Sequence, residues 1–218
     1  NVNIGTITGN TIGSTSSTSI TGTTSTSITT GSNYGMLGIS TISTGIVNIK
    51  NNIIGGMSLT GSTATIVSRM RGIVNTGGTG LKTIENNIIG GNLANSLLVG
   101  VSGTTTVANE LYGIENAGTG VVIIKNNAIS NLIAFSNSST AAVCAGIHVS
   151  AGTDTIVENK IRALINSSND GPRGIRLAST GHFVAYNHID SLVQMNGGSA
   201  NGIIGIINNS GTGAVTIA

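Results

Sequence analysis

The sequence predicts an all-β protein whose chain winds into a parallel solenoid, and three observations support this. The stretch IKNNIIGG at 49–56 returns as IENNIIGG at 84–91 and, more weakly, as IKNNAISN at 124–131. Turn-forming glycine is abundant, with 33 copies, while 39% of the residues are apolar and only 7% are charged. Apolar residues nowhere hold a helical period, and Ile, Thr, Asn and Gly are favoured over strong helix formers. A folded chain of strands and tight turns is therefore expected.

Each repeat is predicted to begin with a strand that carries a Gly-Ile pair. Short apolar runs with period-two alternation surround these pairs, as is typical of strands. A second repeated pattern, Ile/Val-x-x-Asn-x-Ile, begins 10 to 12 residues after each of these glycines. This nearly constant distance indicates a turn and a second strand of nearly fixed length. The pairs are Gly38-Ile39, Gly72-Ile73, Gly113-Ile114, Gly146-Ile147, Gly174-Ile175 and Gly205-Ile206.

The second strand is predicted to end in the pattern Ile/Val-x-x-Asn-x-Ile, which contains a bend and starts a third strand. The return from its Asn to the next Gly-Ile pair varies from 15 to 28 residues, so these polar segments are expected to project from one corner and add local strands. The six copies are Ile7-Asn10-Ile12, Ile49-Asn52-Ile54, Ile84-Asn87-Ile89, Ile124-Asn127-Ile129, Ile156-Asn159-Ile161 and Val184-Asn187-Ile189.

Stacking the repeats in register, about 4.8 Å apart, places the equivalent apolar residues in three buried columns. Ile217 is expected to start a further copy of the first column. The first column holds Ile7, Ile49, Ile84, Ile124, Ile156 and Val184; the second holds Ile12, Ile54, Ile89, Ile129, Ile161 and Ile189; the third runs from Ile39 to Ile206.

The invariant asparagines are predicted to form a structural ladder. Each lies between two inward-pointing residues, where the backbone must bend, and Asn tolerates the left-handed conformation that a bend needs. Stacked side-chain amides can also donate to the next asparagine and accept from the last, which satisfies buried polar groups. The ladder residues are Asn10, Asn52, Asn87, Asn127, Asn159 and Asn187.

With these patterns the chain resembles the right-handed parallel β-helix superfamily, the pectate-lyase-like fold, whose repeat is similar to GI…I.NN.I. The resemblance covers nearly all of residues 1–218 and implies a single domain of about six right-handed coils. It does not select an activity, because that fold carries lyases, hydrolases, phage tailspikes and adhesins.

Charged residues on the outside of the predicted solenoid form two sets. Lys50, Glu85 and Lys125 follow the first Ile of the ladder pattern and would alternate in sign on adjacent repeats, which avoids repulsion between like charges. The second set surrounds the Gly-Ile pairs. It consists of Tyr112, Glu115, His148, Arg173 and Arg176.

The second set is the densest polar group in the sequence and has two interpretations. It can be an exposed charge ladder like the first set, or a glycan-binding site. In a polysaccharide lyase, His148 would act as a base and Arg176 would neutralise a uronate. We favour the exposed ladder, and expect Glu115→Gln and Arg176→Ala to leave folding intact.

Other chemistries lack residues in the expected arrangement. The seven acids do not gather in one column, as glycoside hydrolysis or calcium binding would require, and the histidines lack the spacing of a zinc site. We therefore expect neither metal nor cofactor. A net charge of +2 does not suggest nucleic acid, no apolar run could span a membrane, and Cys144 is expected to be buried. The outward columns lack the regular Thr array that ice binding needs.

Function is suggested by a second resemblance. The Ser/Thr/Gly/Asn-rich repeats with NNIIGG look like the long secreted repeat proteins of bacteria, many exported by the type IX route and displayed as adhesins or filaments. This implies a structural or adhesive segment at the cell surface that contacts glycans or other surface proteins, or that self-assembles. A carbohydrate-active β-helix and a phage tailspike-like module are the alternatives. Because AVTIA stops inside an expected strand, the chain is also expected to be a slice of a solenoid that continues beyond both ends.

Overall fold

A computed structural model describes residues 1–14, 18–26, 34–101, 106–136, 142–195, 202–210 and 214–218. Every regular element among these residues is a β-strand, and the strands form three sheets in which all pairings are parallel. Within the described part of the chain, no helix is long and apolar enough to cross a membrane. Parts of the variable polar segments that were expected to project from one corner, within 14–30, 95–111 and 135–145, lie outside the described residues.

The three sheets are named A, B and C. Sheet A contains β1 (Val2–Ile4), β5 (Val47–Lys50), β9 (Lys82–Glu85), β13 (Val121–Lys125), β16 (Thr153–Val157), β19 (His182–Ala185) and β22 (Val215–Ile217). Sheet B contains β2 (Thr11–Gly13), β3 (Ile20–Thr24), β6 (Ile53–Gly55), β7 (Met57–Gly61), β10 (Ile88–Ile89), β11 (Leu97–Val99), β14 (Ala128–Ala134), β17 (Lys160–Asn166) and β20 (His188–Gln194). Sheet C contains β4 (Met36–Thr41), β8 (Arg69–Asn75), β12 (Glu110–Asn116), β15 (Val143–Val149), β18 (Arg173–Leu177) and β21 (Ile204–Asn208).

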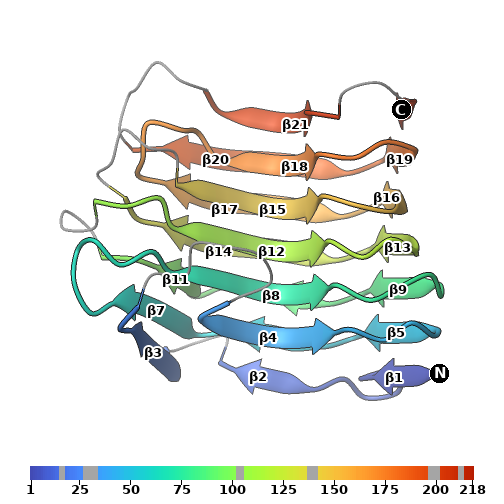
Figure 1. Cartoon of the computed structure of the whole chain (residues 1–218), viewed down its shortest axis with the longest axis horizontal. Coiled ribbons are helices and arrows are strands. Elements are labelled where there is room, and N and C mark those ends of the chain that lie inside the picture. The colour runs from blue at the N-terminus through green and yellow to red at the C-terminus, as the bar shows by residue number, and fades with distance from the viewer. Residues whose placement is uncertain (15–17, 27–33, 102–105, 137–141, 196–201, 211–213) are drawn as a thin grey trace.

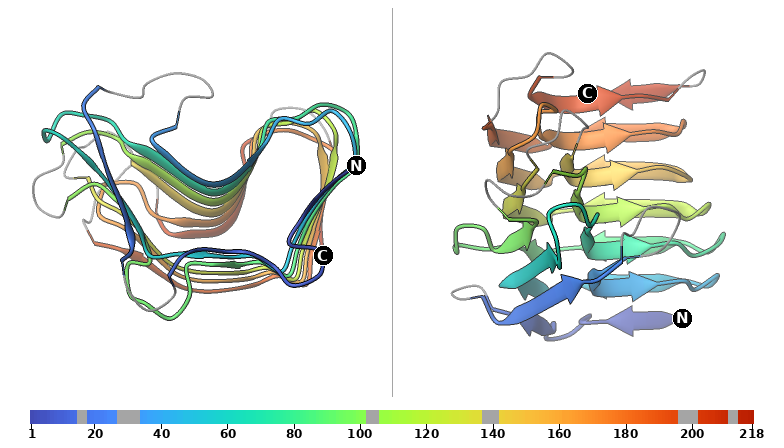
Figure 2. Two further views of the ribbon diagram at one scale, coloured as in Figure 1. Left: turned by 90° about the horizontal axis from the view of Figure 1, so that it is seen from below. Right: turned by 60° about the vertical axis from the view of Figure 1, so that its left-hand side comes forward.

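The chain passes repeatedly from sheet C to sheet A to sheet B, and each strand pairs with its equivalent in the next repeat. The repeats stack with the two termini at opposite ends (Figure 1), and in the end-on view their traces nearly superimpose (Figure 2, left). This arrangement is consistent with a parallel β-solenoid. The expected local strands are also present, because β3, β7 and β11 extend sheet B where β14, β17 and β20 run as single longer strands.

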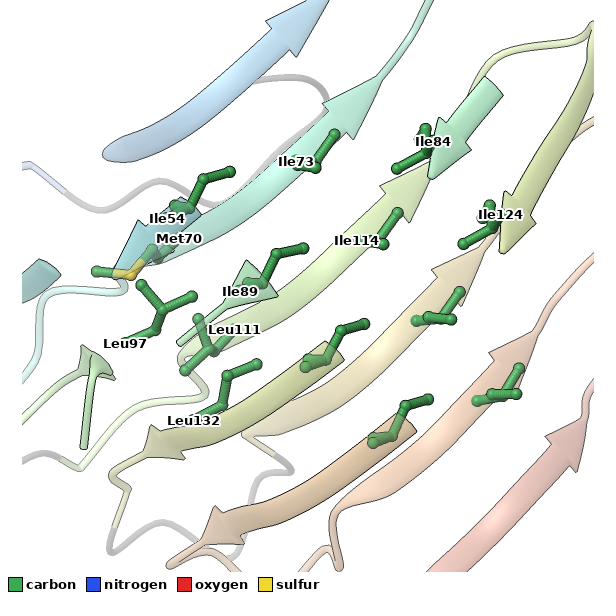
Figure 3. Packing of buried hydrophobic residues seen from close by; sticks show 14 of the residues in the cluster. Ile54, Met70, Ile73, Ile84, Ile89, Leu97, Leu111, Ile114, Ile124 and Leu132 are labelled. Carbon is green, nitrogen blue, oxygen red and sulfur yellow. The ribbon is translucent and has the colours of Figure 1, made fainter. Parts of the chain in front are cut away.

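Buried aliphatic columns fill the space between the sheets (Figure 3). The second and third predicted columns are confirmed member by member, since Ile54 pairs with Ile89 in sheet B and Ile73 pairs with Ile114 in sheet C. Their central members, Ile129 among them, are inaccessible to solvent. Such burial contributes on the order of 25 cal/mol for each Å² of apolar surface removed from water. Cys144 is buried in the same core, as predicted.

The first column differs from the prediction at its first member. Ile4, not Ile7, pairs with Ile49, and Ile7 is 91% exposed. The first repeat therefore has three extra residues before Asn10, and Gly5 begins this longer turn. Ile7 satisfies the pattern in the sequence, but the strand pairing selects Ile4. At the other end Ile217 pairs with Val184, as expected.

The asparagine ladder is confirmed along its whole predicted length. Each side-chain Nδ2 donates to the Oδ1 of the next asparagine, at 2.8 to 3.0 Å, from Asn10 to Asn187. The left-handed residue, however, is the one before each ladder asparagine. Positive φ values of 54° to 60° occur at Asn51, Asn86, Asn126, Glu158 and Tyr186. The ladder asparagine itself therefore serves as a hydrogen-bonding residue and not as the bend.

The glycine of each Gly-Ile pair lets sheet C pack directly on the isoleucines of sheet B. A Cβ atom on Gly113 would lie 2.6 Å from Cγ2 of Ile129 and 2.7 Å from the carbonyl oxygen of Gly146. No side chain fits there, so the strands bend at this position and sheet C bows toward the core (Figure 2, left). The bend resets the alternation, which leaves Tyr112 and Glu115 outside while Leu111 and Ile114 remain inside.

Candidate functional site

The predicted site residues lie on the outer face of sheet C, on strands β12, β15 and β18. Glu115 pairs in register with His148, which pairs with Arg176, so the three occupy one outward column as predicted. Tyr112 lies in the column on the other side of the glycine bend, together with Arg71 and Arg173. We call Tyr34, Arg71, Tyr112, Glu115, His148 and Arg176 the sheet C cluster.

The sheet C cluster is not an exposed charge ladder, which corrects the interpretation favoured from the sequence. Glu115 and His148 are each only 7% exposed, and Tyr112 is 3% exposed. The bowed sheet brings the long side chains of neighbouring columns over one another, so outward-pointing groups become buried. Burial of charges is costly unless they are paired, and the buried carboxylate of Glu115 is paired with Arg71. Among the described residues, Nδ1 of His148 and Nε of Arg176 are buried without a hydrogen-bond partner.

Arg71 is at the centre of the cluster. Its Nε donates to Oε2 of Glu115 at 2.5 Å, and its Nη2 donates to Oε2 of Glu110 at 2.7 Å. The guanidinium lies 3.9 Å from the ring centre of Tyr112 and 5.1 Å from that of Tyr34, a cation–π arrangement. Burial lowers the pKa of Arg71, but the attraction of Glu115, with further contributions from Tyr112 and Glu110, outweighs burial and raises the pKa above its usual value. Arg71 is therefore a permanent, fully paired cation.

His148 is held as a neutral ring against Tyr112. The two ring centres are 4.6 Å apart, and Nη1 of Arg176 donates to the Tyr112 hydroxyl at 3.4 Å. Burial, followed by the charges of Arg176 and Arg71, lowers the pKa of His148 to about 3. Burial also raises the pKa of Tyr112 to about 12. A general base works best with a pKa near the operating pH, so neither ring suits proton abstraction at neutral pH.

Arg173 completes the predicted set but makes its contacts elsewhere. Its Nη2 donates to Oδ1 of Asp170 at 2.7 Å, and its Nη1 donates to the carbonyl oxygen of Gly171 at 2.6 Å. The side chains of Arg173 and Asp170 are both buried. The structure thus brings together four of the five predicted residues, while Arg173 forms a separate ion pair at the start of β18.

Two members of the sheet C cluster, Arg71 and Tyr34, and its neighbour Glu110 are absent from the predicted set. Arg71 precedes a Gly-Ile pair just as Tyr112 does, and Glu110 lies two residues before Tyr112 on the same face, so both could have been found from strand alternation. Tyr34, whose hydroxyl donates to Oε2 of Glu115 at 3.2 Å, comes from the variable segment and carries no repeat pattern. Burial and Glu115 raise the pKa of Tyr34 to about 12, so it remains a donor.

The other predicted charged set has the expected geometry. Nζ of Lys50 lies 2.8 Å from Oε2 of Glu85, and Nζ of Lys125 lies 2.9 Å from Oε1 of the same residue. Hydrogen bonding from Lys50, opposed in part by burial, lowers the pKa of Glu85. These half-exposed pairs contribute little each, about 0.2–1 kcal/mol as measured for exposed ion pairs.

A buried polar set inside the solenoid had no counterpart in the prediction. Asn75 donates to Asn116 at 2.7 Å, and Asn116 donates to Oδ1 of Asp154 at 2.9 Å. Nδ1 of His182 accepts the backbone N–H of Asp154, so it cannot also donate to Oδ2 of that carboxyl, 3.4 Å away. Burial raises the pKa of Asp154 to about 7.

No group of three or more metal-binding side chains gathers among the residues that the structure describes. Comparisons of the chain with protein-family models, with curated proteins and with solved structures find no match. What the chain can do is therefore inferred from its own geometry.

Proposed function

We propose that the chain is a structural, adhesive segment of an extracellular bacterial surface or filament protein, built as a right-handed parallel β-helix of about six coils and pectate-lyase-like in its repeat. The proposal places the protein at the cell surface, with glycans, other surface proteins or further copies of itself as partners, and without catalysis. Long, uniform stacking with an asparagine ladder suits a rigid stem whose outward faces are presented to the surroundings.

The observation that carries the proposal is the internal pairing of the sheet C cluster. A catalytic site keeps a base or nucleophile accessible and poised near neutral pH. Here Glu115 is bound to Arg71, and His148 is buried with a low pKa. On this proposal Glu115 serves to hold adjacent repeats together through Arg71, and the neutral ring of His148 packs against Tyr112.

Two measurements test the proposal. Antibodies raised against the chain should label intact cells of the bacterium that encodes it, and labelling that requires lysis would contradict a surface location. Incubation of the purified chain with polyuronates and neutral polysaccharides should release no new reducing ends and no unsaturated sugar. Release that is abolished by His148→Gln would establish the alternative, a carbohydrate-active β-helix.

A further inference from the structure

A groove of about 640 Å³ lies on the outer face of sheet B, away from the sheet C cluster. Strands β10, β14, β17 and β20 each contribute to its lining. Two outward columns form most of it. One column contains Ala128, Lys160 and His188, and the other contains Ser130, Arg162 and Asp190.

Backbone geometry and small side chains make this face hollow. Asn131, Ala163 and Ser191 have φ values of 52° to 59°, opposite in sign to ordinary strand residues, and β14, β17 and β20 all kink just after the second column. Gly91 and Ser130 are tied together, with the Ser130 hydroxyl donating to the Gly91 carbonyl at 3.0 Å, and neither projects a long side chain. Short side chains thus line the groove at Gly91, Ala128 and Ser130, and long polar side chains line it at Lys160, Arg162 and His188.

Lys160 and Arg162, the two cations in the groove, differ from the other cations of the protein in their contacts. Of the nine Lys and Arg residues, seven contact a carboxylate, a backbone carbonyl or a tyrosine hydroxyl. Lys160 and Arg162 are exposed, and in the described part of the chain they form no ion pair and no side-chain hydrogen bond. They lie on the same face of β17, two residues apart, and so present two exposed positive charges side by side. The charge of Arg162 also acts on Asp190, its neighbour in register on β20.

The groove also contains an acceptor for hydroxyl groups. Nε2 of His188 lies 2.9 Å from Oδ2 of Asp190, and the two side chains are 72% and 41% exposed. Hydrogen bonds from Ser191 and then from His188 lower the pKa of Asp190, which keeps it an acceptor at neutral pH. A ligand with only negative charges would be repelled by this carboxylate, whereas a ligand with both carboxylates and hydroxyls would use it.

We propose that this groove binds a linear acidic glycan, with Lys160 and Arg162 contacting sugar carboxylates and Asp190 accepting hydroxyl hydrogen bonds. Lys160 and Arg162 are about 6.6 Å apart along β17, since a parallel strand rises about 3.3 Å per residue, and Asp190 lies beside Arg162 on β20 at the interstrand spacing of about 4.8 Å. Sugar carboxylates along β17 would therefore contact the two cations while hydroxyls on the β20 side contact Asp190. Among the described residues no Phe, Tyr or Trp lines the groove, and His188 is its one ring, which disfavours a single-stranded nucleic acid that binds by stacking successive bases.

The inference rests on the proposed adhesive function and names the class of partner. Calorimetric titration of the full chain with a hexamer of galacturonic acid should show saturable binding, while the neutral hexamer of glucose, cellohexaose, should bind far more weakly. Arg162→Gln and Lys160→Gln should each weaken binding about tenfold, as expected when one charge-assisted contact is lost. Lys50→Gln, on sheet A, removes the same charge at a distance and should leave binding unchanged.

The Asp190→Asn variant distinguishes a glycan-binding site from a site that binds any anion. It should weaken binding of the acidic hexamer if Asp190 accepts hydroxyl groups, but strengthen it if the groove only attracts negative charge. Absence of saturable binding, stronger binding by Asp190→Asn, or equal binding of a twelve-residue deoxythymidine strand would each overturn the proposal. None of these results would affect the labelling of intact cells, which tests the surface function separately.

Discussion

Glu158 holds a backbone conformation that its side chain does not favour. The residue directly before a ladder asparagine has a positive φ, and in three repeats that residue is itself an asparagine. Glu158 has a φ of 59° at this position, although a glutamate side chain does not favour the left-handed conformation. A left-handed residue with a Cβ costs roughly 1–2 kcal/mol, and asparagine tolerates it better. We expect Glu158→Asn to raise the free energy of unfolding by about 1 kcal/mol in urea denaturation.

The reverse change supplies the control for this prediction. Asn126 has a φ of 54° at the equivalent position one repeat earlier, and it is exposed like Glu158. Asn126→Glu should lower the free energy of unfolding by a similar amount. If both substitutions shift stability in the same direction, the backbone conformation is not the cause.

Asp154 is expected to make stability depend on pH. Its pKa is about 7 in the folded chain and 3.8 in an ordinary setting, because burial disfavours the charged carboxylate. Between these values the native state holds a proton that the unfolded state has lost, so the free energy of unfolding falls as pH rises from about 4 to 7. A difference of about three pKa units sets an upper bound of about 4 kcal/mol.

Asp154→Asn should remove this dependence. The variant cannot ionise at this position, so its stability relative to the parent chain should increase between about pH 4 and pH 8 in urea unfolding. Burial lowers the pKa of His182, which acts in the opposite direction, but His182 is present in both proteins and largely cancels in the difference. A constant difference across that range would show that Asp154 is ionised in the fold.

Most of the structure that could be predicted from the sequence concerns the positions of the strands and their register. Repetition fixes register, since Ile129 must align with Ile89 and Ile161 if the asparagines align. The same reasoning misplaced the first strand, because Ile7 satisfies the pattern as well as Ile4 does and only pairing distinguishes them. Local pattern therefore predicts strands well when several repeats agree, and poorly where one repeat contains an insertion.

Glycines at the bend of sheet C give a test at the level of the element. Gly113→Ala would place a Cβ 2.6 Å from Ile129 and 2.7 Å from the Gly146 carbonyl, so the two sheets would have to separate. Overpacking of this kind typically costs about 1–3 kcal/mol. Thermal unfolding should show a clear loss of stability for this variant.

Gly205 is the matched control, since it occupies the equivalent position in β21, where an added Cβ would meet no atom of the described chain within 4 Å. Gly205→Ala should leave the unfolding temperature nearly unchanged. Equal losses at Gly113 and Gly205 would mean that backbone flexibility, and not contact between sheets B and C, makes glycine necessary there.

Across the whole molecule, the sequence predicts which residues of the site share a column, but it does not predict how the curvature of sheet C buries them. Alternation and register place Glu115, His148 and Arg176 in one outward column. Their burial depends on the bowing of sheet C, which the repeated glycine permits but which the alternation of residues does not predict, and on Tyr34, which comes from the variable segment and belongs to no repeat. The groove on sheet B was missed for a similar reason, because its kinks at Ala163 and Ser191 have no distinctive residue type.

Two ion pairs on different faces of the molecule should therefore differ in their contribution to stability. The Arg71–Glu115 pair joins β8 to β12 with side chains only 2% and 9% exposed, whereas the Lys50–Glu85 pair joins β5 to β9 with side chains 31% and 15% exposed. Removing one partner of a buried pair leaves an uncompensated charge and costs roughly 3–5 kcal/mol, while an exposed pair is worth about 0.2–1 kcal/mol.

Glu115→Gln should accordingly destabilise the chain by about 3 kcal/mol, contrary to the expectation from sequence that folding would be unaffected. Glu110 remains beside Arg71 and offsets part of the lost charge, which places the effect at the lower end of the range. Lys50→Gln should cost less than about 1 kcal/mol. Urea unfolding at low and high salt distinguishes the two, because salt screens the exposed pair and not the buried one. Similar small losses for both variants would mean that the sheet C cluster is solvated, and its residues would then again be available for catalysis.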